Sequence, residues 1–199
     1  MTNNDPHALG KLISCLSLLE NKTSILYETL ADRIGLPFVK SLMLLLAQDS
    51  QKHSKILKGI GESLNKGSVK LKDCEKNTGV SWAAIENMQT EISAKETLSD
   101  SDLLELSEKL VVLESVLGEE YYVFVQLKTL ELLVKEINEN YDVDLGSLKT
   151  VFGGIIDDEE RHRELIEKIR GILESRRKKP AASPFVQYKN PDAWIRPTN

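Results

Sequence analysis

"IIDDEERHRELIEKI", residues 155–169, has a weaker copy in "LAQDSQKHSKILKGI", residues 46–60. Polar side chains at three matching places of the two copies form the pairs Asp49 and Asp158, Ser50 and Glu159, and His53 and His162. The apolar residues around them recur at the spacing of an amphipathic helix. The chain has only three histidines, so two of them at matching places in helical stripes indicate a duplicated element.

The helix before each copy carries a second repeated feature, a glutamate followed seven residues later by a tyrosine. These pairs are Glu20 with Tyr27 and Glu114 with Tyr121, and both lie in apolar stripes. Seven residues are about two helical turns, so the members of each pair face the same way. The chain therefore reads as one helical hairpin that occurs twice.

The pattern over the whole chain predicts an all-α four-helix bundle of two duplicated hairpins joined by a long crossover. "RIGLP" separates the first helix from the second, and Ser99 and Ser101 supply caps for the third. The four long helices are expected from residue 6 to the "RIGLP" break, from 37 to about 60, from about 103 to 137 and from about 145 to 173. A short one is expected within the crossover at 81–92. Residues 1–178 then form one domain with its crossover at 65–100, and 179–199 form an extended C-terminal tail.

Acidic and imidazole groups on apolar faces need an explanation, because burying an unpaired carboxylate costs several kcal/mol. A bound cation, a proton or a hydrogen-bond network can stabilise such a buried carboxylate. Glu159 and His162 are three residues apart, so they are neighbours on one helix face. A hairpin that turns near Ile34 brings Glu20 level with the Ser50–His53 turn. The sequence therefore predicts a shared site that holds a metal ion.

The second hairpin fits this geometry less simply. Glu114 and Glu159 are level only across a turn near residue 136, which lies inside the expected third helix. One alternative is that the helix continues past this point and the following segment returns as extended chain. The other is that Glu119 or Glu120, which suit a compact turn better, supplies the inward carboxylate.

These motifs resemble the ferritin-like superfamily, with the rubrerythrins nearest. The resemblance rests on the glutamate–tyrosine pairs and on "DDEERH", and it covers residues 8–62 and 103–173. It implies a di-iron or di-manganese centre that reacts with dioxygen or peroxide. We expect oxidase, peroxide-scavenging or iron-handling chemistry, and hence an oxidoreductase, with a mononuclear iron site as the alternative. The metal ligands that the resemblance implies are Glu20, His53, Glu114, Glu159 and His162.

The chain departs from the family pattern at two points. Ser50 replaces one of the two usual bridging carboxylates, and serine is a poor ligand beside carboxylate and imidazole. Asp49, one turn before His53, is the alternative ligand there. A cysteine-rich rubredoxin module is absent, so an electron-donor protein is the expected partner. Three other interpretations stay open: a solvated charged face, a metal-free scaffold or interaction module, and a substrate hydroxylase.

Composition and charge limit the remaining choices. The net charge of −5 argues against broad nucleic-acid binding. Cys15 and Cys74 lie far apart without a CxxC pattern, so two separate buried thiols are expected. We expect no secretory signal and no membrane span, and hence a cytoplasmic protein. Bundles of this type often associate, so a homodimer is expected, with the aromatic tail as one candidate contact.

Overall fold

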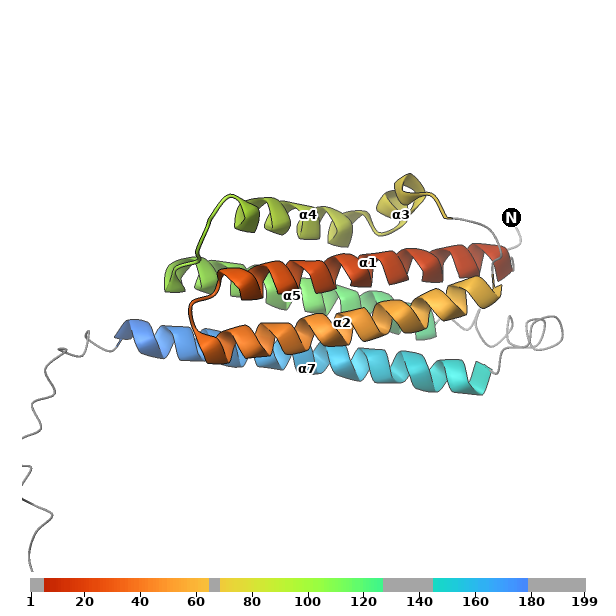
Figure 1. The fold of residues 1–199 in the computed structure, drawn as a ribbon. Coiled ribbons are helices and arrows are strands. Elements are labelled where there is room, and N and C mark those ends of the chain that lie inside the picture. The colour runs from red at the N-terminus through yellow and green to blue at the C-terminus, as the bar shows by residue number, and fades with distance from the viewer. Residues whose placement is uncertain (1–5, 65–68, 127–144, 179–199) are drawn as a thin grey trace, which may run out of the picture.

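The computed structural model describes residues 6–64, 69–126 and 145–178. Within these ranges the chain is entirely helical apart from its turns and one isolated bridge between Ile34 and Leu98. Six helices are described: α1 (Pro6–Arg33), α2 (Pro37–Leu64), α3 (Leu71–Asn77), α4 (Gly79–Ser93), α5 (Asp100–Gln126) and α7 (Leu145–Lys178). The four long ones run alongside one another (Figure 1).

Two packed helix pairs form the body of the structure. α1 packs along α2, α5 packs along α7, and the two pairs meet where α2 contacts α7. Pro37 is the first residue of α2, where its missing N–H leaves no helical hydrogen bond unmade. The prediction of an all-α chain of packed helix pairs is thereby confirmed, including the break between the first two helices.

The crossover carries two helices and lies along one side of the structure, against α1 (Figure 1). α4 was predicted at residues 81–92 and spans Gly79–Ser93. α3 was not predicted, because its seven residues are mostly exposed and carry no apolar stripe. The end of the crossover is attached to the end of α1, since the Leu98 backbone N–H donates to the Arg33 carbonyl at 3.0 Å.

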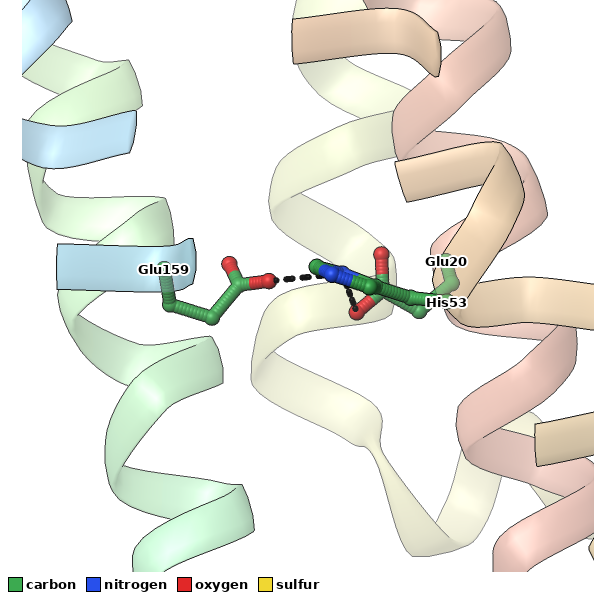
Figure 2. Close-up of side chains that lie close together, drawn as sticks. All are labelled: Glu20, His53 and Glu159. Atoms are coloured by element: carbon green, nitrogen blue, oxygen red, sulfur yellow. Dashed lines mark ion pairs between the residues drawn. The ribbon is translucent and has the colours of Figure 1, made fainter. Parts of the chain in front are cut away.

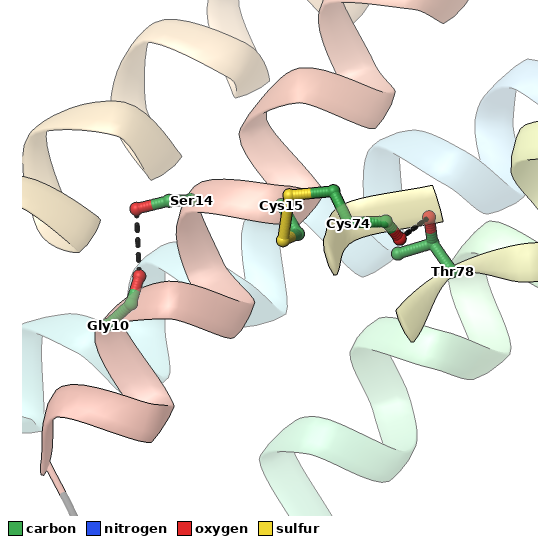
Figure 3. Close-up of a disulfide and its surroundings, with 5 residues drawn as sticks. All are labelled: Gly10, Ser14, Cys15, Cys74 and Thr78. Atoms are coloured by element: carbon green, nitrogen blue, oxygen red, sulfur yellow. Dashed lines mark hydrogen bonds between the residues drawn. A yellow bond between two sulfur atoms is a disulfide. The ribbon is translucent and has the colours of Figure 1, made fainter. Parts of the chain in front are cut away.

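A disulfide joins Cys15 on α1 to Cys74 on α3 (Figure 3). Both residues are fully buried, and their Cα atoms lie 4.9 Å apart although 59 residues separate them in sequence. The expectation of two separate thiols was wrong. The two cysteines carry no recognisable spacing, and they meet only because the crossover folds back over the first helix.

Helix ends follow the expected local chemistry. The Ser99 hydroxyl accepts from the Asp102 N–H at 3.2 Å, and the Asp102 carboxylate accepts from the Ser99 N–H at 2.9 Å. This reciprocal cap begins α5. Cations from Arg176 to Lys178 lie in the last turn of α7, where they complement the helix dipole. No helix of the described ranges is long and apolar enough to cross a membrane.

Three expectations fall outside the described residues. They are the part of the third helix beyond Gln126 with its return segment, the tail at 179–199, and the side chains of Glu119, Glu120 and Tyr121. The described part of α5 is long enough to bring Glu114 inside the structure, where it is 1% exposed.

Candidate metal centre

The five side chains that the sequence singled out come from all four long helices and lie together in the interior. None is more than 2% exposed. α1 contributes Glu20, α2 contributes His53, α5 contributes Glu114, and α7 contributes Glu159 and His162. They form two groups in which the potential ligand atoms all lie within 4.8 Å of one another.

The first triad consists of Glu20, His53 and Glu159 (Figure 2). The imidazole of His53 lies between the two carboxylates. Its Nδ1 is 3.2 Å from Oε1 of Glu159 and 3.5 Å from Oε1 of Glu20. Three helices therefore converge on one imidazole nitrogen.

The second triad consists of Glu114, Glu159 and His162. Nδ1 of His162 is 3.2 Å from Oε2 of Glu114 and 3.8 Å from Oε2 of Glu159. Both triads thus present the Nδ1 atom of histidine to carboxylate oxygens, as expected if the two hairpins are copies.

Glu159 belongs to both triads and divides its two oxygens between them. Oε1 faces His53 and Oε2 faces His162, whose ring centroids are 6.0 Å apart. A carboxylate in this position can bridge two cations. Ser50, at the matching place on α2, is 1% exposed and has no carboxylate to offer, so a single bridge of this kind is described.

The outer ring nitrogen of each histidine, Nε2, contacts an aspartate of the other copy. Nε2 of His53 lies 2.9 Å from Oδ2 of Asp158, and Nε2 of His162 lies 3.4 Å from Oδ2 of Asp49. The aspartate of α7 therefore contacts the histidine of α2, and the aspartate of α2 contacts the histidine of α7. Asp49, the alternative ligand near Ser50, belongs to neither triad, and its carboxylate contacts the outer nitrogen of the opposite histidine.

Lys52 and Arg161 lie between the two aspartates and hold them in place. Lys52 Nζ is 2.9 Å from Asp49 and 2.8 Å from Asp158. Arg161 makes the same two contacts at 2.9 and 2.6 Å. These two cations also occupy matching positions in the sequence copies. The repeat therefore contained a signal that was not used, a basic residue one position before each histidine.

Tyr27 is a buried tyrosine whose hydroxyl donates to a carboxylate, as expected for a core aromatic. Its acceptor is Glu114 of the other hairpin, although Glu20 is the glutamate on its own helix face. This contact links the two packed pairs at the centre and leaves the second Glu114 oxygen for His162.

The carboxylates change the protonation of both histidines. Burial opposes the charged imidazole of His53, but Glu159 and Glu20 outweigh it and raise its pKa to about 10. Burial likewise opposes the charge on His162, while Glu114 and Glu159 raise its pKa to about 11. Burial, together with repulsion from Glu20 and Glu114, raises the pKa of Glu159 to about 8. The metal-free centre therefore holds protons at neutral pH.

Hydrogen bonds do not satisfy every atom of this cluster. His53 Nδ1 and Glu159 Oε1 are buried and lie 3.2 Å apart, yet neither makes a hydrogen bond among the described residues. Buried polar atoms nearly always make hydrogen bonds, whereas these two contact each other as an ion pair. A divalent cation bound by the imidazole nitrogen and the carboxylate oxygen would satisfy both atoms.

A pocket of about 200 Å³ lies beside the second triad, between α5 and α7. Glu114 and Glu159 form part of its lining, together with Gly118, Glu160 and Arg163. The side chains of Glu160 and Arg163 are 54% and 38% exposed and pair with each other at the rim. The second triad is thus adjacent to a partly open cavity.

Comparison of the chain with models of protein families, with curated proteins and with solved structures found no match. The class that the fold and the site define is therefore an all-helical protein with buried carboxylate and histidine groups that can hold a metal ion.

Proposed function

We propose that this protein is a metal-binding, ferritin-like four-helix bundle whose two triads hold iron or manganese. The observation that carries the proposal is Glu159, whose two buried oxygens face a histidine of each hairpin. Glu20 and His53 complete one ion's ligands, and Glu114 and His162 complete the other's. The sequence repeat and the shared carboxylate support the same arrangement independently.

The donor set favours this class of metal. It contains three carboxylates and two imidazoles and no thiolate. Carboxylate and imidazole suit iron and manganese, whereas soft thiolates would favour copper or zinc. A histidine that binds metal through one nitrogen commonly donates from the other to a carboxylate. Asp158 and Asp49 take that second position here.

Ser50 makes the proposed centre asymmetric. Two divalent ions bring four positive charges, whereas the three carboxylates bring three negative ones. Ser50 occupies the place in the first repeat that matches Glu159, and it offers no second bridging carboxylate. A bound iron centre would supply redox chemistry toward dioxygen or peroxide, and the chain would orient it and leave a coordination position open beside Ser50.

The residues around the ions would have distinct tasks. Tyr27 and His162 hold the two oxygens of Glu114, and Lys52 and Arg161 fix the aspartates that orient the histidines. The proposal also includes a homodimer. It includes an external electron-donor protein as well, because the 199 residues contain two cysteines and no cysteine-rich redox motif.

Elemental analysis of the purified full-length chain tests this function. The wild-type protein should retain iron or manganese, and the metal-free protein should bind added Mn²⁺ with a definite stoichiometry. Glu159→Ala should abolish both, whereas Glu164→Ala, on an exposed position of the same helix, should change neither. Metal content that is equal in Glu159→Ala and wild type would overturn the proposal.

A metal-free scaffold is the second candidate function, and the protonation of the centre favours it. His53 and His162 can act as internal cations that neutralise the buried carboxylates. In that case a chelator leaves the unfolding temperature unchanged and Mn²⁺ does not raise it. For the metal-binding function, saturating Mn²⁺ raises the unfolding temperature by mass action.

A further inference from the structure

The pocket between α5 and α7 connects the surface to the proposed centre. Its inner wall contains Glu114 and Glu159, which are 1% and 2% exposed. Its rim contains Glu160 and Arg163, which are accessible to water. A cavity needs only about 10–15 Å³ to hold one water, so a volume of about 200 Å³ admits an ion with hydration waters.

The charges along this pocket favour a cation. Glu114, Glu159 and Glu160 contribute three carboxyl groups to its lining, and Arg163 contributes one guanidinium. The raised pKa of Glu159 leaves Glu114 and Glu160 as the ionised carboxylates of the metal-free pocket at neutral pH. Arg163 donates to Glu160, so its own charge is already paired at the rim. Clefts lined by one sign of charge concentrate ions of the opposite sign and raise their association rates.

One oxygen of the lining residue Glu159 has an ion pair with His53 but no hydrogen bond among the described residues. This oxygen, Oε1, is buried. This atom faces His53 of the first triad, while Oε2 of the same carboxylate faces the second. An ion that reaches Glu159 through the pocket therefore meets the group that both triads share.

We propose that this pocket is the route by which a divalent cation enters and leaves the centre, with Glu160 receiving the ion at the rim. This inference rests on the proposed metal-binding function. The ion takes the place of Arg163 beside Glu160, passes Gly118, and reaches Glu159 and Glu114. Arg163 acts against entry, because it competes with the ion for the same carboxylate.

Gly118 offers a way to close the route. A Cβ at this position would meet only Cβ of Glu159 at 3.6 Å, which is an ordinary contact. A leucine can therefore be placed there, with its remaining atoms in the pocket. Gly171→Leu, on the exposed side of α7 where a Cβ meets nothing within 4 Å, is the matched control.

The experiment measures how fast Co²⁺ enters the metal-free, full-length protein, how fast EDTA removes it, and how tightly it binds at equilibrium. The cobalt absorption band in stopped flow reports the rates. Gly118→Leu should slow both entry and removal at least about tenfold, with the affinity within about twofold of wild type, because blocking a route changes both rates alike. Gly171→Leu should match wild type.

Two rim variants give changes of opposite sign. Glu160→Gln should slow entry about threefold, and Arg163→Gln should speed it about threefold, both less at high salt, because exposed charges act through steering. Glu164→Gln is the control, since Glu164 is similarly exposed and pairs with Lys168 on the same helix. A purely structural role for the rim pair would change both variants in the same direction.

The outcomes separate this inference from the function beneath it. If wild type binds Co²⁺ tightly but Gly118→Leu, Glu160→Gln and Arg163→Gln all load at the wild-type rate, the route is wrong and metal binding stands. If Gly118→Leu also loses affinity, the two rim variants decide. The route stands if Glu160→Gln slows Co²⁺ entry and Arg163→Gln speeds it, and it is overturned if both rates change in the same direction. Wild type without any Co²⁺ binding overturns both proposals.

Discussion

Asp158 on α7 lies 2.9 Å from Nε2 of His53 on α2. Its counterpart Asp49 makes the same kind of contact with His162 on α7, so each copy of the repeat positions the histidine of the other. The two hairpins are therefore coupled by more than apolar packing, because the first triad takes Glu159 from the second hairpin and each histidine contacts an aspartate of the other hairpin. This relationship makes the aspartates specific targets for mutation.

Asp158→Asn should weaken metal binding without removing a ligand. Loss of the carboxylate behind a metal-bound histidine typically costs about 10–100-fold in metal affinity. We expect a similar loss for Asp49→Asn, because the contacts are related by the repeat. Competition with a chromophoric chelator for Co²⁺ measures the affinity. Asp157→Asn, at the neighbouring exposed position, is the control, and an equal loss there would contradict the assignment.

Ser50→Glu should destabilise the metal-free protein much more than the protein saturated with metal. A fourth buried carboxylate, added to those of Glu20, Glu114 and Glu159, should lower the free energy of unfolding of the metal-free protein by about 2–4 kcal/mol. Saturating Mn²⁺ should reverse most of this loss, because the new carboxylate can bridge the ions. Urea unfolding with EDTA or Mn²⁺ measures both values. Ser63→Glu, at an exposed position on α2, should be neutral in both.

Tyr27→Phe should lower the free energy of unfolding by about 1–3 kcal/mol, because it leaves a buried oxygen of Glu114 without its donor. The ring itself remains, so the core volume hardly changes. Thermal or urea unfolding of the metal-free protein measures the effect. Thr29→Val removes a hydroxyl that bonds only within its own helix and should cost less. Equal costs in the two variants would contradict a special role for the tyrosine.

The metal-free protein should lose stability as pH rises above neutrality. The folded-state pKa values of His53 and His162 are raised to about 10 and 11, above the unfolded value of about 6.5. Their contribution is therefore fully present below about pH 6.5 and is lost as pH rises through 10 and 11. The raised pKa of Glu159, about 8, adds a loss between about pH 4.5 and 8.

Urea midpoints in EDTA between pH 6 and 10.5 measure this dependence. Metal binding requires neutral imidazoles and an ionised carboxylate, so saturating Mn²⁺ should flatten the decline and release protons on binding. A metal-free protein whose stability is constant or rises over this range would show that the histidines are not charged in the folded state.

Reduction of the Cys15–Cys74 disulfide should destabilise the crossover. A bond that closes a loop of 59 residues contributes about 2–4 kcal/mol. Cys15→Ser with Cys74→Ser should therefore lower the unfolding temperature, and α3 should become the first target of limited proteolysis. Intact mass after alkylation without reductant checks the bond. Two alkylated thiols in the native protein would contradict it.

The candidate site was largely predictable because duplication leaves a mark in the sequence. Glu20, Glu114 and the two histidines are polar residues inside apolar stripes, and the turn near Ile34 is short enough to place the first pair by counting residues. The same counting left two alternatives for the inward carboxylate of the second hairpin: Glu114, or one of Glu119 and Glu120. The described structure puts Glu114 in the second triad, and the other two side chains lie outside the described residues.

Helix positions and the inward faces of the helices follow from local rules that the sequence by itself determined: apolar spacing, prolines at helix starts, and a serine cap. The exchange of aspartates between α2 and α7, the pairing of Tyr27 with Glu114, and the Cys15–Cys74 bond were decided only by the tertiary structure. The physical reason is that these contacts depend on the rotation of one helix against another and on the path of the crossover, which spacing along a single helix does not specify.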